Sequence, residues 1–140
     1  VPISDLVDGR QYDMKPQPGL YALDIGTGRF KWRSPNTDNL CKGRPFCDAG
    51  LSATITTTPG LVFAGSLDGW MRAYDSKTGK VLWRFDTTAK FDTVGGGFAS
   101  GGSMQGITAP LLYHGTVILP SGYDFTGRMP GNVLIVLGTH

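Results

Sequence analysis

Two kinds of group in this sequence could bind a ligand: glycine backbone that can approach it closely, and neutral side chains that donate hydrogen bonds. Glycines crowd residues 94–106 (VGGGFASGGSMQG), and Ser103 and Gln105 are the side-chain donors within this run. Glycine lets backbone N–H groups come close to a bound carboxylate. The alternative is a flexible connection that is merely rich in glycine. No dinucleotide fingerprint or phosphate-binding loop is present, so the run does not predict a nucleotide site.

The titratable residues do not form a recognisable catalytic set. Asp24 and Asp75 each stand three residues before a Thr-Gly pair, which is typical of a turn. His114 and His140 have no second ligand at metal spacing, so a zinc site is not predicted. The sequence also lacks a nucleophile elbow and a Cys/His nucleophile arrangement. It therefore predicts no catalytic residue.

The two cysteines, Cys41 and Cys47, lie in one loop containing glycine and proline, with five residues between them. This spacing is not a zinc or thioredoxin pattern. A local disulfide is favoured over two unpaired thiols, and it would indicate an oxidising compartment.

An internal repeat organises the chain. Residues 19–33 (GLYALDIGTGRFKWR) are matched by residues 69–84 (GWMRAYDSKTGKVLWR). Five residues recur at an offset of 51: Ala22, Asp24, Thr27, Gly28 and Trp32 are repeated as Ala73, Asp75, Thr78, Gly79 and Trp83. Each copy predicts a hairpin in which a strand ends in Asp, Thr-Gly closes the turn and a second strand carries Trp. Trp32 and Trp83, at matching positions, fit packing better than a ligand platform.

Further strands are predicted at 52–57 and 61–66, and at 108–113 and 116–120, each pair around a tight turn. A third copy of the repeat begins at Asn132. Four strands joined by short links make one blade of a β-propeller. The middle blade then consists, from the inside outwards, of residues 52–57, 61–66, 70–75 and 80–85.

Strand direction alternates within a blade, so successive connections fall on opposite faces. One face receives the short turns at 24–28, 58–60, 75–79 and 114–115. The other receives the long connections 5–19, 34–51, 86–107 and 121–131, with one tight turn at 67–69. Binding sites concentrate on long loops held by a rigid scaffold, so we predict that this loop face is the functional one.

Composition supports an all-β chain. Gly (21) and Pro (9) make up about a fifth of the 140 residues, and all eleven acidic residues are Asp. The net charge of +2 and the absence of a Lys/Arg cluster argue against nucleic acid or an anionic membrane surface as a partner. No apolar run is long enough to span a membrane, and Val1–Ser4 lacks the features of a signal peptide.

The hairpin pattern Ala-x-Asp-x-x-Thr-Gly-x-x-x-Trp resembles the tryptophan-docking repeat of pyrroloquinoline-quinone (PQQ) dehydrogenases. Residues 61–87 (LVFAGSLDGWMRAYDSKTGKVLWRFDT) resemble a late blade of those enzymes, and residues 101–123 and 127–137 are similar to the segments after that blade, near their C-terminus. The last segments and the cysteine loop look most like polyvinyl-alcohol-dehydrogenase-like quinoproteins.

The resemblance implies a fold class: an all-β, β-propeller segment of four-stranded antiparallel blades with tryptophan-docking repeats, in an incomplete ring. The expected parts are a partial blade (1–33), a Cys-containing loop (34–51), a full blade (52–85), a Gly-rich loop (86–107) and a partial blade (108–140).

The resemblance also implies cofactors and sites. Members of the family hold PQQ and Ca²⁺ near the propeller axis. The tight turn with Ser66, Asp68 and Trp70 corresponds to a position close to that cofactor, although an ordinary Asp-Gly β-turn is the favoured explanation. Ser121 and Tyr123 resemble part of a cofactor-proximal loop. One family metal ligand is a Glu, which this chain lacks, so most ligands are expected outside it and no catalytic residue is carried over.

The implied function is part of a periplasmic or secreted dehydrogenase that oxidises alcohols, including polymeric or secondary ones, and passes electrons to a cytochrome c. The segment alone is expected to be inactive. The alternative is a non-catalytic propeller that serves as a scaffold or protein-binding module. Because an incomplete ring leaves inner faces and strand edges unpaired, we expect the rest of a propeller, or other copies of the chain, as partners.

Overall fold

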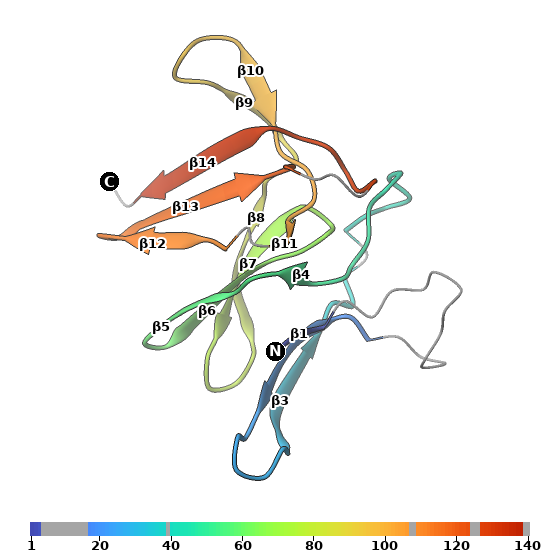
Figure 1. The fold of residues 1–140 in the computed structure, drawn as a ribbon, viewed down its shortest axis with the longest axis vertical. Coiled ribbons are helices and arrows are strands. Elements are labelled where there is room, and N and C mark those ends of the chain that lie inside the picture. The colour runs from blue at the N-terminus through green and yellow to red at the C-terminus, as the bar shows by residue number, and fades with distance from the viewer. Residues whose placement is uncertain (4–16, 39, 107–108, 124–126, 139–140) are drawn as a thin grey trace.

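The described part of the computed structural model covers residues 1–3, 17–38, 40–106, 109–123 and 127–138, and every regular element in it is a β-strand. Three antiparallel sheets follow one another along the chain (Figure 1). They comprise β1 (Pro2–Ile3), β2 (Gly19–Leu23) and β3 (Phe30–Pro35); β5 (Thr56–Thr58), β6 (Leu61–Gly65), β7 (Trp70–Asp75) and β8 (Val81–Asp86); and β12 (Leu111–Tyr113), β13 (Thr116–Ser121) and β14 (Val133–Gly138). We call these sheets blades 1, 2 and 3. The blades are antiparallel and do not close into a ring. This confirms the predicted fold class, an all-β propeller segment in an incomplete ring.

The segments of chain that connect the blades form two smaller strand pairings. Strands β4 (Ser52–Ala53) and β11 (Gln105–Gly106) pair in parallel, and β9 (Lys90–Asp92) pairs with β10 (Phe98–Ser100) in a hairpin. Figure 1 shows that this hairpin projects beyond blade 3. In the described residues no helix is long and apolar enough to cross a membrane.

The two repeated hairpins have the same backbone geometry. In both, the Asp carboxylate accepts the backbone N–H of the Thr three residues on, at 3.0 Å for Asp24 and 2.7 Å for Asp75. Gly28 and Gly79 have positive φ values of 68° and 72°. The pairing β2–β3 and the pairing β7–β8 also shift register at the same repeat position, after Ala22 and after Ala73 respectively.

Strands β6 and β7 of blade 2 are buried on both faces, and their residues alternate between two apolar clusters. Toward blade 3, the cluster contains Phe63 and Met71 with six other buried residues: Ala53, Ala73, Met104, Leu119, Val133 and Ile135. Toward blade 1, the cluster contains Leu20, Leu51, Val62, Ala64 and Tyr74. Successive side chains of a strand point to opposite faces, so a blade with a neighbour on each side needs apolar residues at both sets of positions.

Trp32 joins blade 1 to blade 2. Its indole Nε1–H donates to the Ser76 carbonyl oxygen at 3.0 Å, and a Cβ added at Gly79 would lie 2.4 Å from its ring. Trp83, the repeat partner of Trp32, is 38% exposed. It borders an apolar groove of about 320 Å³ between blades 2 and 3.

Two predicted boundaries differ from the structure. Residues 52–57 do not form one inner strand, because Thr54 donates its N–H and hydroxyl to the Gly106 carbonyl and so ties this part of the chain to β11. Residues 86–107, predicted as a loop, contain β9, β10 and β11. Gly96 and Gly97, both with φ of 85°, supply the turn between β9 and β10.

Candidate functional site

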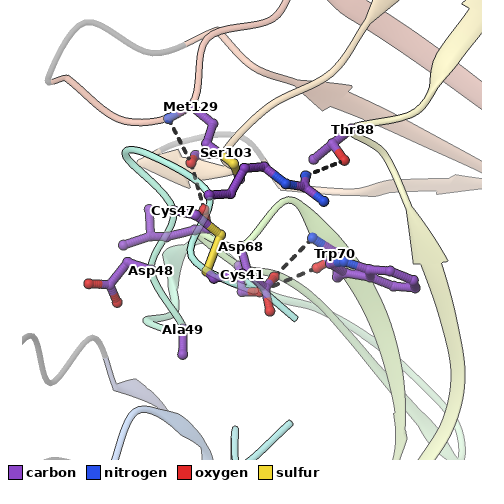
Figure 2. Close-up of a disulfide and its surroundings, with 12 residues drawn as sticks. Cys41, Cys47, Asp48, Ala49, Asp68, Trp70, Thr88, Ser103 and Met129 are labelled. Carbon is purple, nitrogen blue, oxygen red and sulfur yellow. Dashed lines mark hydrogen bonds between the residues drawn. A yellow bond between two sulfur atoms is a disulfide. The ribbon is translucent and has the colours of Figure 1, made fainter. Parts of the chain in front are cut away.

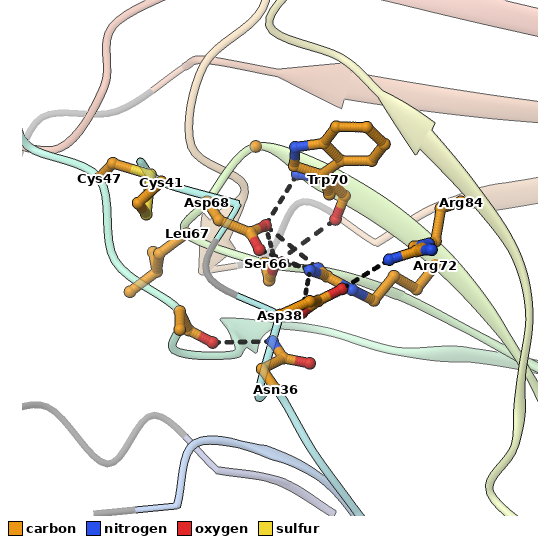
Figure 3. Close-up of polar contacts among 12 residues, drawn as sticks. Asn36, Asp38, Cys41, Cys47, Ser66, Leu67, Asp68, Trp70, Arg72 and Arg84 are labelled. Carbon is orange, nitrogen blue, oxygen red and sulfur yellow. Dashed lines mark hydrogen bonds and ion pairs between the residues drawn. A yellow bond between two sulfur atoms is a disulfide. The ribbon is translucent and has the colours of Figure 1, made fainter. Parts of the chain in front are cut away.

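The described parts of the connections after β3, β8 and β13 pack around the tight turn Ser66–Trp70, whose polar contacts Figure 3 shows. The Asp68 carboxylate accepts the backbone N–H of Trp70 at 2.9 Å, and Gly69 donates its N–H to the Ser66 carbonyl at 3.0 Å. Gly69 has φ of 77°, and a Cβ there would lie 2.2 Å from the Thr88 side chain. The Asp-Gly pair is therefore needed both for the turn conformation and for the close approach of the neighbouring loop.

Arg72 on β7 binds the side chains of Ser66 and Asp68 in this turn. Its guanidinium is 1% exposed and binds Asp68 through two contacts, Nη2–Oδ2 at 2.6 Å and Nη1–Oδ1 at 3.1 Å. Nη1 also donates to the Ser66 hydroxyl oxygen at 2.7 Å, and that hydroxyl bonds Asp68 in turn. Burial by itself lowers the pKa of Arg72, but the hydrogen bonds and charge of Asp68 outweigh it and raise the pKa. The pair is thus a buried, bidentate ion pair.

The glycine-rich segment packs against this turn. The Ser103 hydroxyl donates to the Leu67 carbonyl at 2.6 Å and accepts the Met129 N–H at 3.1 Å. A Cβ at Gly102 would lie 2.1 Å from the Met129 carbonyl oxygen, so only glycine allows this approach. The turn, the glycine-rich segment and the loop before β14 therefore form one packed layer.

Ser121, at the end of β13, joins the same layer. Its buried hydroxyl lies 2.6 Å from the Thr87 hydroxyl, accepts the Gly102 N–H at 3.1 Å and contacts the Gly102 carbonyl at 3.0 Å. The Thr87 hydroxyl also donates to the Gly69 carbonyl at 2.7 Å, which links Ser121 back to the tight turn.

The remaining predicted residues lie at the edge of this layer. Trp70 is half-buried, and its Nε1–H is enclosed without a hydrogen-bond partner among the described residues. Gln105, in β11, is half-buried. Tyr123 is 48% exposed and is the last described residue before residue 127. The structure thus brings the side chains of Ser66, Asp68, Ser103 and Ser121 into one network, to which Trp70 is joined through its backbone.

Cys41 and Cys47 form a disulfide with an S–S distance of 2.04 Å, which confirms the favoured prediction. Figure 2 shows that the loop closed by this disulfide lies against the turn that carries Asp68. Within the loop, Lys42 and Phe46 have positive φ values of 48° and 61°. Arg44 donates from Nη1 to the Thr88 hydroxyl at 2.7 Å, so the loop also reaches the connection after β8.

The side-chain oxygens of these four residues all bond within the protein. Both Asp68 oxygens bind Arg72, and Ser66, Ser103 and Ser121 are likewise occupied. Among the described residues, no group of three or more His, Cys, Asp or Glu side chains could hold a metal ion. What these side chains can do is hold the loop layer in one arrangement.

Sequence reasoning missed the charged residues that organise the layer. Arg72, Asp38 and Arg84 form a chain in which Asp38 binds Arg72 Nη2 at 3.3 Å and Arg84 Nη1 at 2.8 Å. One signal was present: Arg72 stands within the apolar strand WMRAYD, and an arginine in a buried strand needs an acidic partner. The identity of that partner depends on how the chain folds back.

Comparisons with known proteins agree with the predicted family and fold. The family described as "Glucose/ethanol/alcohol dehydrogenase, beta-propeller domain" (PQQ) matches residues 6–103. A polyvinylalcohol dehydrogenase of Pseudomonas sp. is 42% identical over 85% of this chain and 20% of its own length. A 1-butanol dehydrogenase (cytochrome c) of Thauera butanivorans is 30% identical over 84% of this chain and 16% of its own length.

A solved structure supports the same relationship. The quinohemoprotein alcohol dehydrogenase ADHIIG from Pseudomonas putida superposes with a TM-score of 0.53 and 29% identity, over 82% of this chain and 17% of that one. The fold is that of a quinoprotein β-propeller. The chain belongs to the PQQ dehydrogenase β-propeller family. It spans about a fifth of the length of the relatives it matches.

Proposed function

We propose that this chain is part of a PQQ-dependent dehydrogenase that oxidises alcohols and passes the electrons to a cytochrome. The observation that carries the proposal is the family match over residues 6–103, which includes both repeated hairpins, the cysteine loop and the tight turn. The relatives named as alcohol dehydrogenases, one of them linked to cytochrome c, support the reaction class and the acceptor.

Within the whole enzyme, we assign this chain a supporting part of the cofactor-facing surface. PQQ and Ca²⁺ are held mainly by residues outside it, because Ser66, Asp68, Ser103 and Ser121 are engaged in internal hydrogen bonds. These four residues maintain the shape of the loop layer. Trp70, Gln105 and Tyr123, at its edge, are the side chains proposed to face the cofactor.

The relatives also support a proposal for the substrate class. The 42% identity to a protein named polyvinylalcohol dehydrogenase supports polymeric or secondary alcohols as substrates. The disulfide supports a periplasmic or secreted location, where such bonds persist.

The test uses the intact protein that contains this chain. It is incubated with PQQ and Ca²⁺, and dye-linked oxidation of polyvinyl alcohol and of a small secondary alcohol is measured. We expect oxidation that requires both additions, with samples lacking either one as controls. An intact protein that neither binds PQQ nor oxidises an alcohol would overturn the proposal and favour the alternative, a non-catalytic propeller scaffold.

A further inference from the structure

The connection between β3 and β4 contacts the tight turn, the connection after β8 and the loop before β14. We call its described residues, 36–38 and 40–50, the disulfide loop. The Gly50 carbonyl accepts the Leu67 N–H at 2.9 Å, which attaches the loop to the tight turn. Arg44 reaches Thr88, and Asp48 lies 3.9 Å from Arg128 in the loop before β14. The disulfide loop therefore spans the ends of blades 2 and 3.

The strongest of these contacts runs through Asp38. Its two oxygens bind Arg72 at 3.3 Å and Arg84 at 2.8 Å, so one carboxylate joins a buried and an exposed guanidinium (Figure 3). Arg72 in turn holds Asp68 and Ser66, whose bonds define the tight turn. A guanidinium carries five N–H donors in a rigid plane, so a carboxylate at one edge restricts the orientation of the other edge.

Asp38 suits a positioning role better than a role in folding. It is 32% exposed, whereas Arg72 and Asp68 are each 1% exposed and already paired with one another. Removal of the Asp38 charge leaves that buried pair intact. The disulfide closes the loop three residues beyond Asp38, and the Asn36 amide donates to the Ala49 carbonyl at 2.8 Å, so both ends of the loop are held.

We propose that Asp38 is a positioning residue. Acting through Arg72, it holds the turn Ser66–Trp70 in the arrangement required for quinone binding, and the Cys41–Cys47 disulfide keeps Asp38 in place. The quinone part of this inference rests on the proposed function. The effect on the turn does not, since it concerns only contacts within the chain.

The experiment compares Asp38→Asn with wild type in the intact protein. Backbone amide exchange is measured for Leu67, Gly69 and Trp70. Gly69 and Trp70 donate hydrogen bonds within the turn, and Leu67 donates from the turn to the Gly50 carbonyl of the disulfide loop. We expect exchange there to rise at least roughly tenfold, as local opening becomes easier. The apparent dissociation constant for PQQ should rise by about tenfold, the usual scale for loss of a supporting hydrogen bond around a bound group.

Three further variants sharpen the comparison. Asp92→Asn also removes one carboxylate, an exposed one on the β9–β10 hairpin, and should change neither quantity. Asp38→Glu should restore both in part, and Cys41→Ser/Cys47→Ser should reproduce the Asp38→Asn effect. Circular dichroism spectra like that of wild type would show that the variants are folded.

Two outcomes would overturn the inference. Unchanged exchange in the turn of Asp38→Asn would show that Asp38 does not hold it, and faster exchange with unchanged PQQ binding would show that the turn is not positioned for the quinone. If wild type binds no PQQ, the proposed function fails, while the exchange data still decide whether Asp38 holds the turn.

Discussion

At the scale of single residues, two buried polar side chains of β7 differ in whether they have partners among the described residues: Arg72 has them and the Tyr74 hydroxyl does not. Arg72 is buried but fully paired, so its charge is compensated by Asp68 and Asp38. Tyr74, two residues along the same strand, is 0% exposed, and its hydroxyl has no hydrogen-bond partner among the described residues. A buried hydroxyl without a partner costs about 1–3 kcal/mol, whereas a paired charge does not carry the same penalty.

We therefore predict that Tyr74→Phe does not destabilise the protein at neutral pH and raises the free energy of unfolding by about 1 kcal/mol. The aromatic ring remains in its apolar cluster with Leu20 and Val62, and only the unpartnered hydroxyl is lost. Urea unfolding of the intact protein at pH 7 measures the difference. A loss of stability in the variant would mean that the hydroxyl has a partner.

The same substitution should change the response to alkaline pH. Burial raises the pKa of Tyr74 to about 12 from 10.0, although the nearby charge of Arg72 opposes the shift. The unfolded chain loses the Tyr74 proton near pH 10, whereas the folded state keeps it up to about pH 12. Stability is therefore unaffected by this shift below pH 10 and falls as pH rises from 10 to 12. The wild type should thus lose up to about 3 kcal/mol more than Tyr74→Phe over that range. Equal losses would contradict this assignment.

At the scale of elements, the hairpin turns were predictable because their determinants are local. Asp75, Thr78 and Gly79 lie within five residues, and their side chains and positive φ build the turn without help from distant parts of the chain. The β9–β10 hairpin was not predicted. Its strands are only three residues long, so they show no alternation that could outweigh the glycines between them.

The role of Trp32 can be tested by a matched pair of glycine substitutions. Gly28→Ala and Gly79→Ala both place a Cβ at positive φ, which costs about 1 kcal/mol. Around Gly28 there is nothing within 4 Å, whereas a Cβ at Gly79 meets the Trp32 ring at 2.4 Å. We expect Gly79→Ala to cost about 2 kcal/mol more than Gly28→Ala.

Denaturant unfolding of the two variants in the intact protein measures this difference. The chemistry and backbone conformation of the two sites match, so the excess reports the contact between blades 1 and 2. Equal losses of stability would show that Trp32 does not pack against the neighbouring turn in solution.

At the scale of the whole molecule, apolar surface remains uncovered. Trp83 and Leu82 are 38% and 53% exposed beside the groove between blades 2 and 3. Leu134 and Val136 on β14 are 59% and 61% exposed, and β14 pairs only with β13 among the described strands. Exposed apolar groups beside an unpaired strand edge favour association with another chain.

We predict that residues 1–140, produced alone, associate in a concentration-dependent manner. Light scattering over a dilution series measures this, and Leu134→Lys/Val136→Lys should weaken the association because charges on an edge strand oppose pairing. A stable, monodisperse monomer of the unchanged chain at all concentrations would contradict the prediction.

The sequence by itself determined the repeat, the hairpin turns, the all-β class and the propeller, since each depends on residue types at short, regular spacings. It also indicated the disulfide, because two cysteines six positions apart can meet within one loop. Only the tertiary structure decided that Asp38 binds Arg72, that Ser103 bonds Leu67 and that Trp32 contacts Gly79. These contacts join residues 34 to 47 positions apart, and no local pattern states which distant groups meet. Their partners are set by the packing of one blade on the next.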